Sequence, residues 1–239
     1  MKEKLSIITL NINMYNKNSK IKRNTDEVVK FLLAENPSLI SLQEFGNRSF
    51  NGDINGINLI RILENNNYTI VEPYIDGKNP VNVRLLFDKT KIELVERLPP
   101  LYSKFFVNRQ IGGLFKTLGG IPLIVFSIHL PLYERNPKEK RQMWENIISF
   151  AKVKQNKSII IAGDFNENSL NNNPTILSDK IEELSNYFKP ASEKEIPTWR
   201  NKKLDHIFVN PELVVEKYKT LENTVSDHKA LTLNFNLEV

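Results

Sequence analysis

The most constraining feature of this chain is a short apolar run that ends in an acid and an amide. Residues 158–162 read Ser-Ile-Ile-Ile-Ala, and Gly163-Asp164-Phe165-Asn166 follow directly. β-Branched residues favour a buried strand, and Gly163 allows the main chain to bend where that strand ends. Because side chains two residues apart on an extended chain point the same way, Asp164 and Asn166 are expected to face one site. A carboxylate beside a neutral amide suits a phosphate bound through a metal ion.

Apolar runs flanked by polar side chains recur along the chain. Those side chains are Asn11 and Asn13 after residues 5–10, Glu44 after 38–43, His129 after 123–128, Asp205 within 203–209, and Asp227 and His228 before 230–235. In layered α/β folds, catalytic residues gather where strands end and loops begin. All three histidines of the chain lie in these segments, which favours one common site.

Composition limits the chemistry of that site. The chain has 239 residues and no cysteine, so disulfides, thiolate nucleophiles and cysteine metal sites are excluded. Carboxylate, amide and imidazole groups remain, and they suit Mg²⁺, Mn²⁺ or Ca²⁺. The length predicts one domain over residues 1–239 rather than two. A formal charge of +5 permits a polyanionic partner without requiring one.

The sequence also carries expectations about location. No apolar run approaches the ~18 residues of a membrane span. Residues 1–4, Met-Lys-Glu-Lys, pass straight into a predicted strand without the apolar core of a signal peptide. The sequence therefore predicts a cytoplasmic protein without a membrane span, and we expect a monomer.

Hydrophobic periodicity and turn residues predict the remaining elements. Helices are expected from Asn24 to Asn36, at Ile57–Glu64, at Pro137–Lys154 and at Ile176–Asn186. Further strands are expected at Tyr68–Val71, Val83–Phe87, Ile92–Glu96, Phe105–Gln110 and Ile121–Ile128, with turns at Gly112-Gly113 and Gly119-Gly120. This order indicates an α/β fold with two packed mixed sheets flanked by helices.

Six short segments occur in one order between residues 10 and 228. They are Leu10-Asn11-Ile12-Asn13, Leu42-Gln43-Glu44, Ser127-Ile128-His129-Leu130, Gly163-Asp164-Phe165-Asn166, Leu204-Asp205-His206-Ile207 and Ser226-Asp227-His228. Together they resemble the endonuclease/exonuclease/phosphatase superfamily. The resemblance implies a four-layer α/β sandwich with the site at one rim, and cleavage of phosphate esters with a divalent metal. It implies the chemistry more firmly than the substrate.

The resemblance implies a set of metal-binding residues. Glu44 resembles the family's principal metal carboxylate, and Asn11 or Asp227 would help it to place the ion. We expect Mg²⁺, with Mn²⁺ or Ca²⁺ as alternatives. Asn13 stands where several nuclease branches carry an acid, which puts a second metal contact in doubt.

The same resemblance implies the catalytic residues. Asp205 resembles the acid that hydrogen-bonds to the site histidine, His228, and fixes its tautomer. Asp164 and the Asp205–His228 pair would orient and deprotonate water, and the sequence leaves open which of them is the base. Asn166 and His129 would hold the phosphate oxygens.

Several of these residues have a purely structural alternative. Asn11 could cap a turn, and His129 could be a packed structural histidine. His206 is expected to be structural, because strand alternation turns it away from Asp205. Trp199 could stack on a base or pack in the core.

Two groups of basic residues could meet substrate phosphates at the rim. Lys17, Lys20, Lys22 and Arg23 follow the Asn13 turn, while Arg135, Lys138, Lys140 and Arg141 follow the His129 turn. We assign Lys20, Lys22 and Arg23, with Trp199, to substrate binding. The alternative is that these charges form a solvated helix face.

We therefore predict a divalent-metal-dependent phosphodiester hydrolase, most simply a nuclease acting on DNA or RNA. A phosphatase or phosphodiesterase acting on inositol phosphates, phospholipid headgroups or other small phosphate esters is the second interpretation. The third is a catalytically silent binding domain of the same fold, against which the complete set of matched catalytic positions argues. The sequence does not choose among DNA, RNA and small esters.

Overall fold

The computed structural model describes residues 2–74, 82–102, 106–154, 157–170, 174–191 and 196–238. Within these ranges the chain forms two six-stranded sheets. The sheets pack face to face around a cluster of buried aliphatic and aromatic side chains. No helix of the described ranges is long and apolar enough to cross a membrane, while the cytoplasmic location and the monomeric state stay predictions.

The first sheet is mixed and is built from both ends of the chain. Its strands are β1 (Lys2–Asn11), β2 (Leu39–Phe45), β3 (Tyr68–Ile70), β4 (Asn82–Asp88), β11 (Val214–Leu221) and β12 (Ala230–Glu238). They lie in the order β11-β12-β1-β2-β4-β3. β1 and β2 run parallel, and the other neighbours run antiparallel.

The second sheet has the same kind of arrangement. Its strands are β5 (Ile92–Arg97), β6 (Gln110–Thr117), β7 (Pro122–His129), β8 (Ile159–Asp164), β9 (Lys189–Pro190) and β10 (Asp205–Val209). They lie in the order β5-β6-β7-β8-β10-β9. β7 and β8 run parallel, and the other neighbours run antiparallel.

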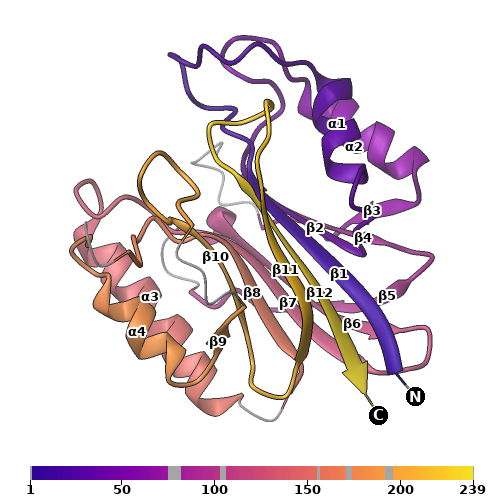
Figure 1. Cartoon of the computed structure of the whole chain (residues 1–239), viewed down its shortest axis with the longest axis vertical. Helices are drawn as coiled ribbons and strands as arrows, with labels where there is room; N and C mark the ends of the chain where they lie inside the picture. The colour runs from indigo at the N-terminus through magenta and orange to yellow at the C-terminus, as the bar shows by residue number, and fades with distance from the viewer. Residues whose placement is uncertain are drawn as a thin grey trace.

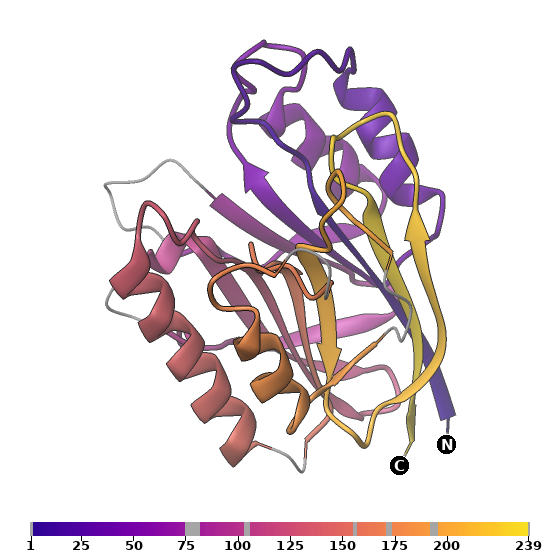
Figure 2. The ribbon, with the colours of Figure 1, turned by 60° about the vertical axis from the view of Figure 1, so that its left-hand side comes forward.

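Helices cover the outer face of each sheet. α1 (Thr25–Leu33) and α2 (Gly56–Asn65) pack on the first sheet, and α3 (Pro137–Val153) and α4 (Asp179–Ser185) pack on the second. Figures 1 and 2 show the two helix pairs on opposite sides of the molecule, with both sheets between them. The predicted four-layer α/β sandwich is therefore confirmed.

The α1 helix begins where the sequence predicts it. The Asn24 side chain accepts the main-chain N–H of Glu27, and the Glu27 carboxylate accepts the N–H of Asn24, which forms a reciprocal cap. Val28, Val29 and Leu32 then lie buried on the face that meets the sheet. The cap and the apolar stripe both come from local sequence, which is why this element was predictable.

The prediction was wrong around β6. Phe105 lies outside the described residues, Val107–Arg109 form a short 3-10 helix (η1), and the strand starts only at Gln110. Gly112 and Gly113 lie inside β6 and form no turn. Glycine is needed at both positions because the rings of Phe126 and Phe115 occupy the space that a side chain would fill. A Cβ on Gly112 would lie 2.2 Å from the Phe126 ring. The predicted turn at Gly119-Gly120 is confirmed, with Gly120 at φ +89°.

The face between the sheets changes from apolar to polar along the strands. Going toward one rim, the side chains on this face are Leu5, Ile7, Thr9 and Asn11 in β1, Leu123, Val125, Ser127 and His129 in β7, and Ile160, Ala162 and Asp164 in β8. Because each strand contributes its polar end to the same rim, the fold collects these side chains in one place.

A buried hydroxyl and amide layer lies just below that rim. The Ser41 and Ser127 hydroxyls are 2.6 Å apart and join the two sheets. Gln43 donates to both hydroxyls, at 2.8 and 3.3 Å, and Thr9 donates to Ser41 at 3.2 Å. Buried polar groups that satisfy one another in this way hold their neighbours rigidly, so the floor of the rim is fixed across both sheets.

Candidate active site

Strand register places three of the predicted catalytic side chains in a row. His129 in β7 pairs with Asp164 in β8, and Asp164 pairs with Asp205 in β10. His129 Nε2 lies 3.7 Å from Asp164 Oδ2. All three residues are buried, so the charges of the two carboxylates act on each other with little screening by water.

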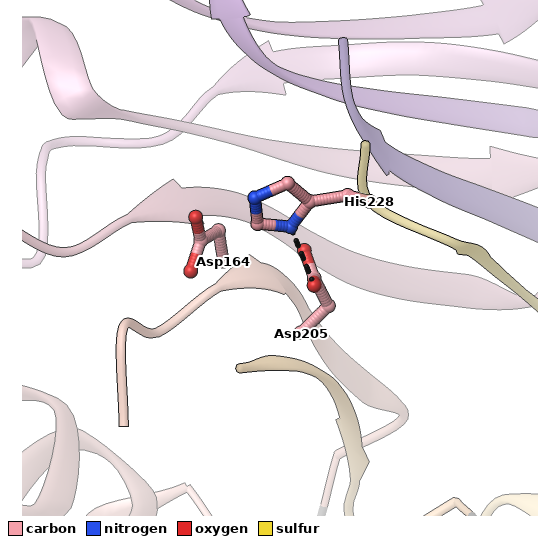
Figure 3. Close-up of side chains that lie close together, drawn as sticks. All are labelled: Asp164, Asp205 and His228. Carbon is pink, nitrogen blue, oxygen red and sulfur yellow. Dashed lines mark hydrogen bonds and ion pairs between the residues drawn. The ribbon is translucent and has the colours of Figure 1, made fainter. Parts of the chain in front are cut away.

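Asp205 and His228 form a hydrogen-bonded pair beside Asp164 (Figure 3). His228 Nδ1 donates to Asp205 Oδ2 at 2.9 Å, and the Thr198 hydroxyl oxygen fixes the start of β10 by accepting the N–H groups of Leu204 and Asp205. Burial alone lowers the pKa of His228, but the charge and hydrogen bond of Asp205, with smaller contributions from other acids, raise it to about 10. His228 therefore carries its proton at neutral pH.

Asp164 is held by two donors at the end of β8. Its Oδ1 accepts the main-chain N–H of Asn166 at 2.8 Å, and its Oδ2 accepts Asn11 Nδ2 at 2.9 Å. Burial and then the charge of Asp205 raise the pKa of Asp164 to about 7. Gly163 before it is required by space, since a Cβ there would lie 1.9 Å from the Ile128 carbonyl oxygen and φ is +145°.

Asn11 brings Glu44 and Asp164 together. Its Nδ2 donates to Glu44 Oε1 at 3.2 Å as well as to Asp164 Oδ2. Burial raises the pKa of Glu44 even though the Asn11 hydrogen bond opposes the shift. Two desolvated carboxylates that converge on one amide group are what a hard divalent cation would stabilise. The residues present therefore fit the metal that the sequence predicts.

A second carboxylate cluster fits a metal less well. Among the described residues, ligand atoms of Asp164, Asp205 and His228 lie within 4.8 Å of one another. A histidine must be neutral to bind a metal, and His228 is protonated and bonded to Asp205. We therefore favour the Glu44 side of the site.

Asp227 is tied to two neighbours at the rim. Its Oδ1 accepts Asn13 Nδ2 at 2.5 Å, and its Oδ2 accepts Trp199 Nε1 at 3.1 Å. The Trp199 ring lies 6.2 Å from the His228 ring. Trp199 is thus anchored beside the site and is not packed in the core; the metal-binding role of Asp227 stays a prediction.

Three site residues have left-handed main-chain conformations. Asn13, Glu44 and Asn166 all have φ of 51°. Asparagine tolerates this region, but for glutamate it is uncommon and costs conformational energy. The Asn166 side chain is also fixed, since its Nδ2 donates to the Leu130 carbonyl at 2.8 Å. Strained positions of this kind concentrate at functional sites.

These residues surround a cavity of about 660 Å³. Its lining includes seven predicted site residues: Glu44, His129, Asp164, Asn166, Trp199, Asp227 and His228. The walls add three cations, Arg109, Arg135 and Lys202, and two aromatic rings beside Trp199, those of Tyr15 and Tyr133. Leu132 and Ile176 are exposed at the same cavity. The arrangement can hold an anion at its centre with a flat or apolar group beside it.

The prediction that Arg23 binds substrate was wrong. Its guanidinium is buried and donates to the main-chain carbonyls of Ile12, Asn13 and Val225. Lys20 and Lys22 are exposed and border a separate surface depression, so their contact with substrate stays a prediction.

Lys140, in the second basic group, is also buried, contrary to the prediction for that group. Its ammonium lies 2.5 Å from the Glu167 carboxylate and donates to the Asn166 carbonyl at 2.7 Å. It is therefore unavailable to a phosphate.

Sequence reasoning missed Arg109. The guanidinium lies 3.4 Å from His129 Nδ1, and an arginine can only donate. Burial, followed by the charges of Arg109, His228 and Lys140, lowers the pKa of His129 well below its usual value. His129 is therefore neutral with its proton on Nε2, facing the carboxylates. Arg109 was hidden because its η1 segment was assigned to a strand.

His206 is structural, as the sequence predicts. It is buried between aromatic rings of Phe165 and Phe208, and its Nε2 lies 3.1 Å from the Glu167 carbonyl oxygen. Burial and then the Lys203 charge lower its pKa from 6.5 to about 4. Its side chain does not line the cavity.

This shift predicts a loss of stability in acid. In the unfolded chain His206 becomes protonated below about pH 6.5, whereas in the folded chain it stays neutral down to about pH 4. The neutral His206 side chain therefore makes its full contribution to the free energy of unfolding above pH 6.5. As the pH falls toward 4, that free energy decreases by up to about 3 kcal/mol. Urea unfolding should show that His206→Gln loses less stability than the native chain between pH 7 and 4. Parallel losses in the two proteins would contradict this.

Comparison with known proteins agrees with the fold. The family model described as "Endonuclease/Exonuclease/phosphatase family" matches residues 8–228. A family protein from Bacteroides thetaiotaomicron superposes with a TM-score of 0.78 at 13% identity, covering 100% of both chains. D. rerio TDP2 complexed with single-strand DNA product gives 0.73 at 15% identity, covering 98% of this chain and 99% of that one. A mannosyl-6-phosphatase from Bacteroides thetaiotaomicron superposes with a TM-score of 0.71 at 15% identity, covering 97% of this chain and 99% of that one. No curated protein sequence matches.

Proposed function

This chain belongs to the endonuclease/exonuclease/phosphatase family, and we propose that it is a divalent-metal-dependent hydrolase of phosphate esters. One observation carries the proposal. Glu44 and Asp164, which both accept Asn11 Nδ2, line a cavity that is also lined by His228, and His228 is hydrogen-bonded to Asp205 behind it. The arrangement combines acids for a cation, a proton acceptor for water and a fixed positive charge for an oxyanion.

Each group of the chain has a distinct task in this proposal. Asp164, with a pKa near 7, accepts a proton from the attacking water, because a general base works best when its pKa lies near the working pH. Charged His228, fixed by Asp205, and the Nε2–H of His129 donate hydrogen bonds to phosphate oxygens. Glu44, with an oxygen of Asn11 or Asp227, would hold the cation, which would supply charge that neutralises the phosphate.

We favour a nucleic-acid substrate, as the wall of the cavity suggests. Tyr15, Tyr133 and Trp199 offer rings for stacking, and Arg135 and Lys202 offer cations for neighbouring phosphates. The structural neighbour TDP2 was crystallised with a single-strand DNA product. A strand end or a short single strand would bring one phosphate to the centre of the cavity.

A small phosphate ester is the second candidate. A volume of about 660 Å³ falls in the range of small-molecule sites. Arg23 and Lys140 are buried, so two of the charges that suggested a polyanion are unavailable. One structural neighbour is a mannosyl-6-phosphatase.

Loss of metal or of the Glu44 charge is expected to stop hydrolysis. EDTA should abolish activity and Mg²⁺ or Mn²⁺ should restore it, while Glu44→Gln should lower the rate by ~10²-fold or more, as for a positioned charge contact. Glu64→Gln, an exposed site on α2, is the matched control and should change nothing.

A panel of substrates separates the candidates. It holds plasmid DNA, single-stranded DNA, RNA, abasic duplex, inositol phosphates and sphingomyelin, each with Mg²⁺, Mn²⁺ and EDTA. Preferential cleavage of single strands supports the nucleic-acid proposal, and cleavage of inositol phosphates alone supports the second candidate. Full activity in EDTA would exclude the metal, and no hydrolysis by the folded protein would favour a silent binding domain.

A further inference from the structure

The buried Arg23 guanidinium joins two loops of the site. Its side chain is 1% exposed. One terminal nitrogen donates to the carbonyls of Ile12 and Val225, at 2.7 and 2.6 Å, and the other donates to Asn13 O at 2.8 Å. Ile12 and Asn13 follow β1, whereas Val225 precedes β12. The guanidinium therefore links chain segments that are two hundred residues apart in sequence.

Both linked segments carry groups of the site. Asn13, whose carbonyl Arg23 binds, donates through Nδ2 to Asp227 Oδ1. Val225 lies two residues before Asp227, which also accepts Trp199 Nε1. Between them, the Ser226 hydroxyl donates to the Asn11 carbonyl at 2.5 Å and accepts the His228 N–H at 3.1 Å. Arg23 thus lies directly behind the contact between Asn13 and Asp227.

The fourth contact of Arg23 fixes the guanidinium itself. Nε lies 3.3 Å from Asp53 Oδ2, and the Ser49 hydroxyl donates to the other oxygen of Asp53. A planar group with donors on three sides can hold three carbonyls and a carboxylate at once, which the single ammonium of a lysine cannot do. The geometry therefore calls for arginine and not only for a positive charge.

We propose that Arg23 is a positioning residue that sets the place of Asp227, and through it the orientation of the Trp199 ring. Asn13 has a left-handed main chain, so its carbonyl needs a fixed partner to keep the side chain directed at Asp227. Without the guanidinium, the carbonyls of Ile12 and Val225 lose the donor that joins them. The Asp227 carboxylate then loses its fixed position at the cavity.

Trp199 gives a readout that requires no substrate. The chain has two tryptophans, and Trp144 lies on the buried face of α3, so Trp144→Phe leaves Trp199 as the single reporter. In this background Arg23→Lys should move the Trp199 emission to longer wavelength and raise its quenching by iodide. Asp227→Ala should cause the same change, and adding Arg23→Lys to it should change little more. Arg48→Met, at a nearby exposed arginine, should have no effect.

A kinetic test rests on the proposed function. Arg23→Lys should lower kcat/KM about 10–100-fold, the range for a residue that supports a site ligand. The Arg23→Lys/Asp227→Ala double variant should be no slower than Asp227→Ala, because the two residues act through one group.

Three results would overturn the inference: unchanged Trp199 fluorescence in folded Arg23→Lys, additive emission shifts, or kinetic losses that multiply. If Arg23→Lys does not fold, Asp53→Asn loosens the guanidinium without deleting it, and it must shift Trp199 in the same direction. Because the fluorescence does not depend on hydrolysis, failure to find a substrate would count against the proposed function alone.

Discussion

Replacing Asp205 or His228 with alanine is expected to lower the rate of phosphate-ester hydrolysis by about 10²–10⁴-fold, the range for a positioned acid or base. The two side chains are 2.9 Å apart, and Asp205 is the main reason that the pKa of His228 is raised. Without the carboxylate, His228 loses both its charge and its orientation. Without the imidazole, Asp205 is a buried acid with no partner at Oδ2.

The double variant provides the sharper test of this pair. Because both residues act through one imidazolium, the double alanine variant should be little slower than the slower single variant. Asp179→Ala, at an exposed acid on α4, serves as the control and should retain full activity. Rate losses that multiply in the double variant would show that the two residues act separately, and thermal melting should confirm that each variant is folded.

Lys140→Met is expected to destabilise the folded protein by about 3–5 kcal/mol, the usual cost of removing one partner from a buried ion pair. The Lys140 and Glu167 side chains are both fully buried. Removing the ammonium leaves the Glu167 carboxylate without its counter-charge and the Asn166 carbonyl without a donor. The midpoint of urea unfolding should fall accordingly.

The same helix supplies a matched control for this prediction. Lys138→Met makes the same substitution two residues earlier, at an exposed position, and should change the free energy of unfolding by less than about 0.5 kcal/mol. Equal effects in the two variants would mean that the buried pair contributes nothing specific. Because Lys140 holds the main chain of Asn166, the variant should also lose activity under conditions where it is still folded.

Much of the fold could be predicted because its signals are local. The apolar runs before Asn11, Glu44, His129 and Asp164 all form strands that end at or next to those residues. α1 carries its own cap and apolar stripe. The order of the six segments then indicated the two-sheet arrangement, and the register of β7, β8 and β10 brings the predicted acids and histidine together.

What could not be predicted depends on residues distant in sequence. From sequence alone, Arg23 and Lys140 are indistinguishable from surface charges. In the fold, Arg23 is buried against the Val225 carbonyl and Lys140 against the Glu167 carboxylate. Gly112 suggests a turn from sequence, but it lies in a strand where the Phe126 ring leaves no space for a side chain. In each case the deciding partner comes from another element, so local propensity gives no sign of it.

The left-handed residues at the rim bear on any attempt to transplant this site to another scaffold. Designed sheets normally avoid positive φ angles at non-glycine residues, yet Asn13, Glu44 and Asn166 all have a positive φ. A scaffold with regular strand ends would direct the Glu44 carboxylate and the Asn166 amide elsewhere, even with every side chain copied. A designer would therefore have to copy three turns, with the hydrogen bonds that hold them, before the constellation could be reproduced.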